Sequence, residues 1–409
     1  MKLSHLFITL SALLMVSFTA ACTSGSDNPG PVGPAGPAGP PGPAGPSGDQ
    51  ASLGQEYVGS QQCASCHETQ YAPFILSGHP YKLTRVTNGS APEYPYDSLT
   101  GGLDELPTGY TWNDISYVIG GFAWKARFIN TSGYIITDTP DSSGDSAYLN
   151  QYNFANDAVG TDESWVGYHP GEENKPYDCG GCHTTGYSPL GHQNDMPGIT
   201  GTWALEGVQC EACHGPGSQH VQAPQAVSME LDRSSQLCGS CHVRNNPAVI
   251  DASDGFEKHH EQYEDLYSSK HFATSCVTCH NPHASAVYAD TDVNPNKGIT
   301  QSCESCHWQN TTRKVDKHSS KIVSCTACHM PPMGKSAVAD LGIFTGDIHS
   351  HQFSINTDPD APQFNEDGSA VMPYLTLQYT CGWCHNGVEY SEKDITTLAL
   401  FAEGYHDEE

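Results

Sequence analysis

The arrangement of cysteines constrains this chain more than any other feature of its sequence. Sixteen of the 17 cysteines form eight Cys-x-x-Cys-His motifs, and the remaining one is Cys22. Two thiols three positions apart share one helical turn, so both can add to the vinyl groups of one porphyrin, and the following histidine then faces the iron. Zinc sites and disulfides also use paired cysteines, but neither explains a histidine after every pair. We therefore expect eight covalently attached haem c groups.

The expected haem attachments follow directly from these motifs, which we number from first to eighth along the chain. The thioether cysteines are Cys63, Cys66, Cys179, Cys182, Cys210, Cys213, Cys238, Cys241, Cys276, Cys279, Cys303, Cys306, Cys325, Cys328, Cys381 and Cys384. The proximal iron ligands are His67, His183, His214, His242, His280, His307, His329 and His385.

The second axial ligand of each iron decides what a haem can do, because a second histidine closes the iron and an open position binds substrate. Apart from the motif histidines and His5, twelve histidines remain, enough for a second one on every iron. The expected distal ligands are His79, His192, His220, His260, His271, His283, His318 and His351, with His259 as the alternative to His260. The weakest candidates are His169, His349 and His406.

The residues before the first motif predict export and a tether. Lys2, an apolar run and the sequence Thr-Ala-Ala-Cys22 predict a signal peptide over 1–21 and lipidation of Cys22, with a plain secretory signal as the alternative. Within 22–53, glycine recurs at every third position from Gly30 to Gly48. This collagen-like pattern predicts a stiff polyproline-type stalk, and a trimerising triple helix is the alternative.

Composition limits the fold and the partners. Only 37% of the residues are hydrophobic, so the haems must supply much of the core of the domain expected over 54–409. We expect a mainly α fold with much irregular coil and a small haem-free β-rich insertion over 88–165, marked by strand-like stretches at 115–119 and 126–130. The net charge of −29 excludes a nucleic-acid partner. Membrane attachment is expected only through the lipid anchor, because no later stretch could span a bilayer.

Three stretches carry a family resemblance. Residues 57–67 resemble the opening of multihaem cytochromes related to the tetrahaem electron acceptor of nitrifying bacteria, whereas 210–218 and 325–331 are similar to multihaem cytochromes of metal-reducing bacteria. The superfamily includes electron carriers, filament subunits and octahaem enzymes that act on hydroxylamine, nitrite or tetrathionate. The chain has no Cys-x-x-Cys-Lys motif, which marks the catalytic haem of many nitrite reductases. A distal lysine, as in the tetrathionate enzymes, stays open, with Lys270 and Lys321 as candidates.

The resemblance and the motifs together give one main functional hypothesis. We expect an electron carrier rather than an enzyme, passing electrons through eight haems at the cell surface to other cytochromes or to an extracellular acceptor. It would be an outer membrane lipoprotein or a periplasmic protein. One alternative is a reductase of nitrite, hydroxylamine or tetrathionate with one open haem. Another is a filament subunit in which a histidine such as His406 reaches across an interface.

One short stretch raises the question of calcium. Asp290, Asp292 and Asn294 have the spacing of a calcium loop. Pro295 lies where an EF-hand requires glycine, so calcium stays an unsupported cofactor.

Overall fold

The computed structural model describes residues 54–95, 103, 105–138, 148–287, 298–310, 318 and 323–406. The chain divides into two compact units, residues 1–41 and 42–409, and every described residue belongs to the second. The predicted signal peptide, Cys22, the whole of the predicted stalk and the stretch from Asp290 to Pro295 lie outside the described residues.

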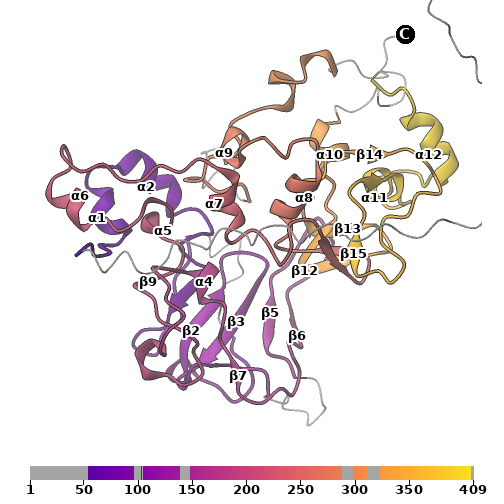
Figure 1. Cartoon of the computed structure of the whole chain (residues 1–409). Helices are drawn as coiled ribbons and strands as arrows, with labels where there is room; N and C mark the ends of the chain where they lie inside the picture. Colours follow the sequence, from indigo (N-terminus) through magenta and orange to yellow (C-terminus); the bar gives the residue numbers. More distant parts are fainter. Residues whose placement is uncertain are drawn as a thin grey trace, which may run out of the picture. The chain divides into compact units, whose positions relative to one another are not determined.

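The segment between the first two motifs forms a seven-stranded sheet (Figure 1). Its strands are β1 (Leu83–Arg85), β2 (Ile115–Gly120), β3 (Lys125–Asn130), β4 (Tyr134–Ile135), β5 (Gln151–Asn153), β6 (Ser164–Val166) and β7 (Lys175–Pro176). The order is β1-β2-β3-β4-β7, and β5 pairs with both β3 and β6. All of these pairings are antiparallel. Strands β2 and β3 occupy the two stretches that the sequence marked as strands.

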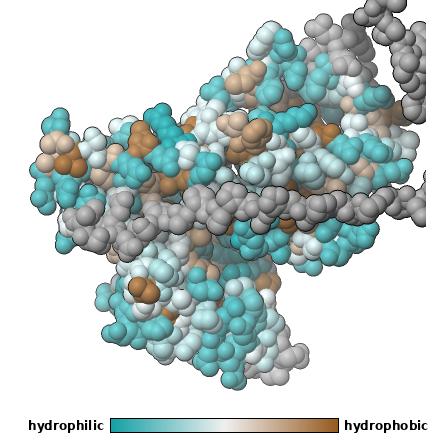
Figure 2. All heavy atoms as spheres, in the orientation of Figure 1, coloured by the Kyte–Doolittle hydropathy of each residue, from teal (hydrophilic) through white to brown (hydrophobic). Residues whose placement is uncertain are grey.

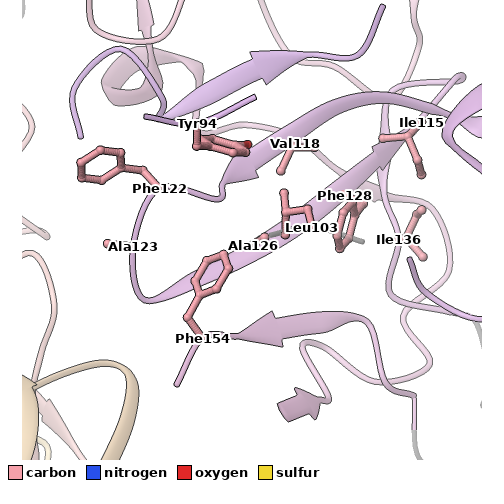
Figure 3. Close-up of a cluster of buried hydrophobic side chains, with 10 residues drawn as sticks. All are labelled: Tyr94, Leu103, Ile115, Val118, Phe122, Ala123, Ala126, Phe128, Ile136 and Phe154. Carbon is pink, nitrogen blue, oxygen red and sulfur yellow. The ribbon is translucent and has the colours of Figure 1, made fainter. Parts of the chain in front are cut away.

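Both faces of this sheet are buried. Neighbouring residues in a strand point to opposite faces, so Val118 joins one apolar cluster and Tyr117 joins another. Figure 3 shows the first cluster, in which Phe128 of β3 packs with residues of β2 and of the flanking loops. A sheet covered on both faces is a rigid base, and it holds the β2–β3 turn in a fixed position.

The β2–β3 turn contacts a second, five-stranded sheet. Its strands, in the order β13-β12-β11-β10-β15, are β13 (Thr345–Ile348), β12 (Gly334–Asp340), β11 (Phe256–Lys258), β10 (Ile250–Ser253) and β15 (Ala370–Val371). Trp124 in the turn donates its indole N–H to the carbonyl oxygen of Asp347 at 2.9 Å. Lys125 donates to the carbonyl oxygen of Ser336. Two more pairs of short strands are β14 (Ile355–Asn356) with β16 (Leu375–Thr376), and β8 (Thr184–Thr185) with β9 (Leu205–Glu206).

The helices are short, and most of them carry a haem motif. Those that include motif residues are α1 (Ser60–Ala64), α4 (Gly180–His183), α5 (Cys210–His214), α7 (Ser235–Gly239), α9 (Cys276–Cys279), η4 (Cys303–Ser305), α10 (Cys325–His329) and α11 (Leu377–Gly382). The others are α2 (Glu68–Phe74), η2 (Trp112–Asp114), η3 (Gln193–Asp195), α6 (Ser218–Gln222), α8 (Gln262–Ser268), η5 (Trp308–Asn310) and α12 (Ile395–Ala402). In the part of the chain that the structure describes, no helix has the length and apolar character needed to cross a membrane.

The expectation of a mainly α fold is wrong. Helix accounts for only 23% of the structure and strand for 21%. The reason is physical: a Cys-x-x-Cys-His motif needs one helical turn and no more, as when the amide of His67 bonds to the carbonyl oxygen of Cys63 at 2.9 Å. The segments between the motifs satisfy many of their backbone groups by strand pairing instead.

Candidate functional site

Seven of the eight motif histidines face a histidine from another part of the chain. Their ring centres lie 5.7 to 6.3 Å apart. The pairs are His67 with His220, His214 with His283, His242 with His79, His280 with His351, His307 with His271, His329 with His406 and His385 with His318. In three of them the planes are within 30° of parallel, at 28°, 4° and 24°.

This spacing fits an iron atom between the two rings. An iron–nitrogen bond of about 2.0 Å, similar to other histidine–metal bonds, plus about 1.1 Å from nitrogen to ring centre on each side, gives about 6.2 Å. Apolar side chains beside the pairs also fit a porphyrin. Phe272 and Trp308 follow the paired His271 and His307, and each is 66% exposed. Figure 2 shows a largely hydrophilic face with scattered hydrophobic side chains.

Hydrogen bonds at Nδ1 orient several of these rings. His214 lies 2.8 Å from the carbonyl oxygen of Glu230, and His329 lies 2.7 Å from that of Phe353. On the partner side, His220 lies 2.6 Å from the carbonyl oxygen of Val227. A carbonyl can only accept, so each Nδ1 carries the proton and the lone pair at Nε2 is available to a metal.

Six of the eight predicted distal histidines are among these pairs, and two are not. His192 lies with Nδ1 2.5 Å from the carbonyl oxygen of Ile199, and the ring of His260 lies 3.9 Å from that of His259. His406, one of the weakest candidates, faces His329 at 6.1 Å. The sequence does not indicate this pairing. His406 follows α12, and only the packing of α12 against α11 brings it close to the seventh motif.

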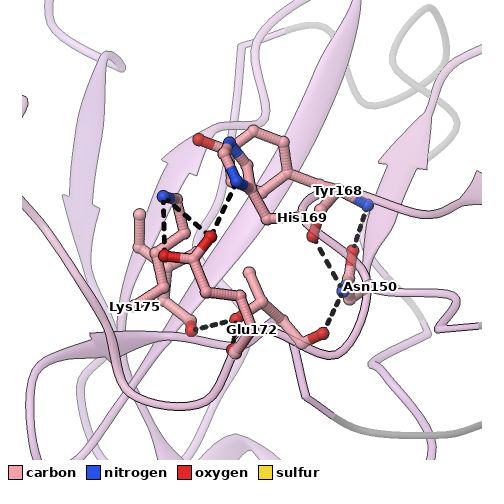
Figure 4. Close-up of polar contacts among 7 residues, drawn as sticks. Asn150, Tyr168, His169, Glu172 and Lys175 are labelled. Carbon is pink, nitrogen blue, oxygen red and sulfur yellow. Dashed lines mark hydrogen bonds and ion pairs between the residues drawn. The ribbon is translucent and has the colours of Figure 1, made fainter.

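Two further histidines have other surroundings. His169 is paired with Glu172 at 2.7 Å, in a polar cluster with Lys175 on the β insertion (Figure 4). His349 lies 2.5 Å from the carbonyl oxygen of Met330.

The second motif differs from the other seven. Among the residues that the structure describes, no histidine ring faces His183 at the distance seen in the seven pairs. His183 is nevertheless oriented in the same way, with Nδ1 3.1 Å from the carbonyl oxygen of Lys82. His183 is therefore the one motif histidine without a ring partner at this distance among the described residues, although His260 lies near enough to interact with it electrostatically.

Positive charge gathers around His183. Burial, together with the charges of Lys82, Arg127 and Lys125, lowers the pKa of His183 to about 4. Burial likewise lowers the pKa of Lys125 to about 7, with Arg127 adding to the effect. The pKa of Lys82 is lowered by burial alone, and no hydrogen bond or ion pair to its amine is found within the described part of the chain; the amine lies 5.7 Å from the centre of the Trp124 ring.

His259 and His260 belong to the same region. Burial lowers the pKa of His260 to about 3, and His183 is the next cause. Burial also lowers the pKa of His259, followed by the charge of Lys125. Both imidazoles are therefore neutral near pH 7, and each can donate one hydrogen bond and accept another.

Four buried carboxyl groups lie close to these histidines in the chain. They are Glu257, Glu261, Glu264 and Asp265, each at most 2% exposed. Glu261 accepts a hydrogen bond from Nε of Arg244 at 2.6 Å, and Asp265 accepts from the amide of His351 at 2.6 Å. Burial raises the pKa of Glu261 to about 8 and that of Asp265 to about 6. The described residues contain no group of three acidic, histidine or cysteine side chains arranged for a metal ion.

The cationic residues and the carboxyl groups were not predicted. One signal was available: the chain has only 17 lysines and arginines, so a lysine and an arginine two positions apart in the haem-free β segment are conspicuous. Lys125 and Arg127 occupy those positions on β3, beside the turn that contacts the second sheet.

Contacts between cysteines of different motifs place the eight attachment sites side by side. The side chain of Cys63 lies beside that of Cys210, that of Cys182 beside Cys241 and that of Cys238 beside Cys276. Electrostatic interactions join Cys213 with Cys241, Cys279 with Cys303 and Cys381 with Cys328. Cys325 lies 3.4 Å from the carboxylate of Glu304 in the sixth motif. The order of neighbours is thus first, third, fourth, fifth, sixth, seventh and eighth, with the second beside the fourth.

Comparisons with known proteins agree with this geometry. Residues 150–215 match the family described as cytochrome c554 and c-prime, and residues 270–312 match the doubled CXXCH motif. The chain is 28% identical over 142 residues to multiheme cytochrome MtrA of Shewanella baltica, covering 31% of this chain and 36% of that protein. It is 24% identical over 251 residues to C-type polyheme cytochrome OmcB of Geobacter sulfurreducens, covering 59% and 29%. The matched part is thus about a third of the length of these relatives.

Two solved structures share the fold. The octaheme sulfite reductase MccA of Wolinella succinogenes superposes with a TM-score of 0.57 at 17% identity, covering 86% of this chain and 71% of that chain. The outer cell wall cytochrome OcwA superposes with a TM-score of 0.51 at 16% identity, covering 85% and 86%.

Proposed function

We propose that this multihaem c-type cytochrome carries eight haems, of which seven relay electrons and one is the site where a small anion is reduced. The observation that carries the proposal is the difference between His183 and the other motif histidines. Seven motif histidines face a second histidine at 5.7 to 6.3 Å, and His183 does not within the described residues.

The seven histidine pairs would close seven irons. An iron held by two histidines exchanges electrons without binding substrate. The proposed distal ligands are His79, His220, His271, His283, His318, His351 and His406. His192 and His260 have no place in this set. Neither does a lysine: Lys321 lies outside the described residues, and nothing in the structure links Lys270 to an iron.

The contacts between motifs support a continuous electron path. Cysteines that touch across motifs would bring the porphyrins attached to them close together. The path would run from the first haem through the third and fourth to the eighth. The haem attached at Cys179 and Cys182 would branch from the fourth haem, since the side chain of Cys182 lies beside that of Cys241. Electrons arriving from either end would reach this branch.

The residues around His183 suit an anionic substrate. Lys82 and Lys125 bring positive charge into a half-buried region in which a charge interacts strongly with a small anion. His259 and His260 are neutral there, so a ring N–H of each could donate a hydrogen bond to an oxyanion. When bound, the haem supplies the electrons. The carbonyl group of Lys82 holds the His183 ring in the orientation that this requires.

At the level of the fold, the comparisons agree equally with a reductase and with a surface cytochrome. The fold is shared with an octaheme sulfite reductase and with an outer cell wall cytochrome. It therefore accommodates both a reductase and a surface cytochrome, and the choice for this chain depends on the His183 site. Nitrite, hydroxylamine, tetrathionate and sulfite are the substrates to compare.

We also propose export, with residues 1–21 as signal peptide, Cys22 as lipid attachment site and 22–53 as tether. The relatives named above include surface cytochromes, which agrees with an exported protein. A filament would need His406 to reach another subunit. The ring of His406 faces His329 of its own chain, so the structure favours a self-contained molecule.

Three measurements on the purified holoprotein test the proposal. Mass spectrometry should find eight haems, and nitrite or sulfite added to the oxidised protein should change the absorption of one haem in eight. A chemically reduced dye should then be reoxidised in the presence of at least one of the four substrates. If no anion changes the spectrum and none is reduced, the protein is an electron carrier only.

A further inference from the structure

The two haems at the end of the proposed path share one supporting element, the residues that follow α12. This helix begins after Asp394, whose side chain accepts a hydrogen bond from the amide of Thr397 at 2.9 Å. It is packed through Leu398, which is only 6% exposed. Gly404 then turns the chain with a φ of +58°, a backbone conformation that glycine adopts readily. The turn presents Tyr405 and His406 to the seventh and eighth motifs.

Tyr405 contacts the histidine that faces the eighth motif. Its hydroxyl lies 2.9 Å from Nδ1 of His318, and His318 faces His385 with ring centres 6.3 Å apart. If Nε2 of His318 faces an iron, Nδ1 carries the proton and donates it to the Tyr405 oxygen. Such a bond fixes the ring orientation and makes the imidazole a more basic ligand.

His406 contacts the neighbouring motif. Its ring lies 6.1 Å from that of His329 and within 24° of parallel, and 5.3 Å from that of Tyr405. The two motifs are themselves joined, because Trp383 of the eighth donates to the carbonyl oxygen of Ala327 in the seventh at 3.0 Å. One dipeptide therefore supports the distal side of two adjacent haems.

From this arrangement, we propose that Tyr405 is a positioning residue for the eighth haem and that Tyr405 and His406 hold the distal sides of the last two haems as one unit. The inference rests on the ligand set of the proposed function. A movement of this dipeptide, for example when a redox partner docks, would change both haems together at one end of the electron path.

The test is Tyr405→Phe in the full-length holoprotein, which removes the hydroxyl and keeps the ring. All low-spin signals in the electron paramagnetic resonance spectrum should persist, and the g values of one should change. The midpoint potential of the eighth haem should rise by about 59 mV. This shift corresponds to a tenfold loss in the preference of His318 for ferric over ferrous iron when its hydrogen bond to Tyr405 is removed. Tyr94→Phe is the matched control, because its hydroxyl bonds to the carbonyl oxygen of Gly120 in the β insertion.

A second variant tests the coupling. His406→Ala should convert the seventh haem to high spin and also shift the signal of the eighth. If Tyr405→Phe changes neither spectrum nor potentials, or if His406→Ala affects the seventh haem alone, the inference is wrong. His318→Ala separates this failure from failure of the ligand set: it should create one high-spin haem, and if it does not, the proposed ligand of the eighth haem is wrong as well.

Discussion

The carbonyl oxygen of Lys82 lies 3.1 Å from Nδ1 of His183, and the side chain of the same lysine extends into the region around that histidine. The backbone of Lys82 thus orients the proximal ligand of the second motif. Its amine, for which the described residues offer no hydrogen bond or ion pair, adds positive charge near His183. These two roles can be separated by mutation.

Lys82→Met removes the amine and keeps the carbonyl group. We expect anion binding to weaken roughly tenfold or more, because a charge-assisted hydrogen bond contributes about 1.5 to 3 kcal/mol. The spin state of the second haem should not change. Spectroscopic titration with nitrite measures the affinity. Lys335→Met is the control, because its amine is 3.8 Å from Asp254 on the surface and should have no effect on binding.

Anion affinity should depend on pH through Lys125. Its pKa is lowered to about 7, first by burial and then by the charge of Arg127. The ammonium form exists below that pKa and is lost above it, so binding should weaken as pH rises through about 7. Lys125→Arg keeps its charge at every pH used and should bind with little pH dependence. Equal pH profiles for the two proteins would assign the titration to another group.

Glu211 holds the first and third motifs together. Its buried carboxylate accepts hydrogen bonds from the amides of Val58, Gly59 and Gly217 at 2.7 to 3.1 Å. Glu211→Gln replaces one acceptor oxygen by an amino group, which leaves a buried amide without a partner. The free energy of unfolding should fall by about 2 kcal/mol.

Chemical denaturation of the holoprotein measures this change. The control is Glu206→Gln, which removes a surface ion pair with Arg85. That substitution should cost less than about 1 kcal/mol. Similar losses for the two variants would show that the carboxylate of Glu211 does not hold the motifs together.

Phe353 lies beside three histidines, of which His329 belongs to the seventh motif and His271 and His351 face the sixth and fifth motifs. Its ring lies 4.5 Å from that of His271 and 6.0 Å from that of His351, and its carbonyl oxygen accepts from His329. It also has a φ of +63°, which is unfavourable for phenylalanine. Phe353→Leu should change the low-spin signals of the fifth and sixth haems and leave that of the seventh nearly unchanged. Phe154→Leu, in the core of the β insertion, should change none of them.

The local chemistry could be predicted from the sequence, and the long-range pairing could not. A Cys-x-x-Cys-His motif specifies its own helical turn and one ligand, because all of its atoms lie within five residues. Which histidine lies opposite depends on the fold. His79 is close in sequence to the first motif, yet its ring faces His242 of the fourth. The second sheet could not be predicted from the sequence either, since β11 pairs with β12 from a distant part of the chain.

The surroundings of His183 could not be predicted from the sequence for a related reason. Counting histidines favoured a second histidine on every iron, with His260 or His259 completing the set and one open haem as the alternative. In the structure, His259 and His260 lie side by side, and Lys82, Lys125 and Arg127 bring positive charge near His183. Lys82 directly precedes β1, and Lys125 and Arg127 lie on β3, so only the folded sheet brings them together.

The most direct test of the account is the low-temperature electron paramagnetic resonance spectrum of the oxidised holoprotein. The account predicts seven low-spin haems and one high-spin haem, with the high-spin signal changing when nitrite or sulfite is added. Eight low-spin haems would contradict it, because the iron held by His183 would then have a second strong ligand and no position open to an anion.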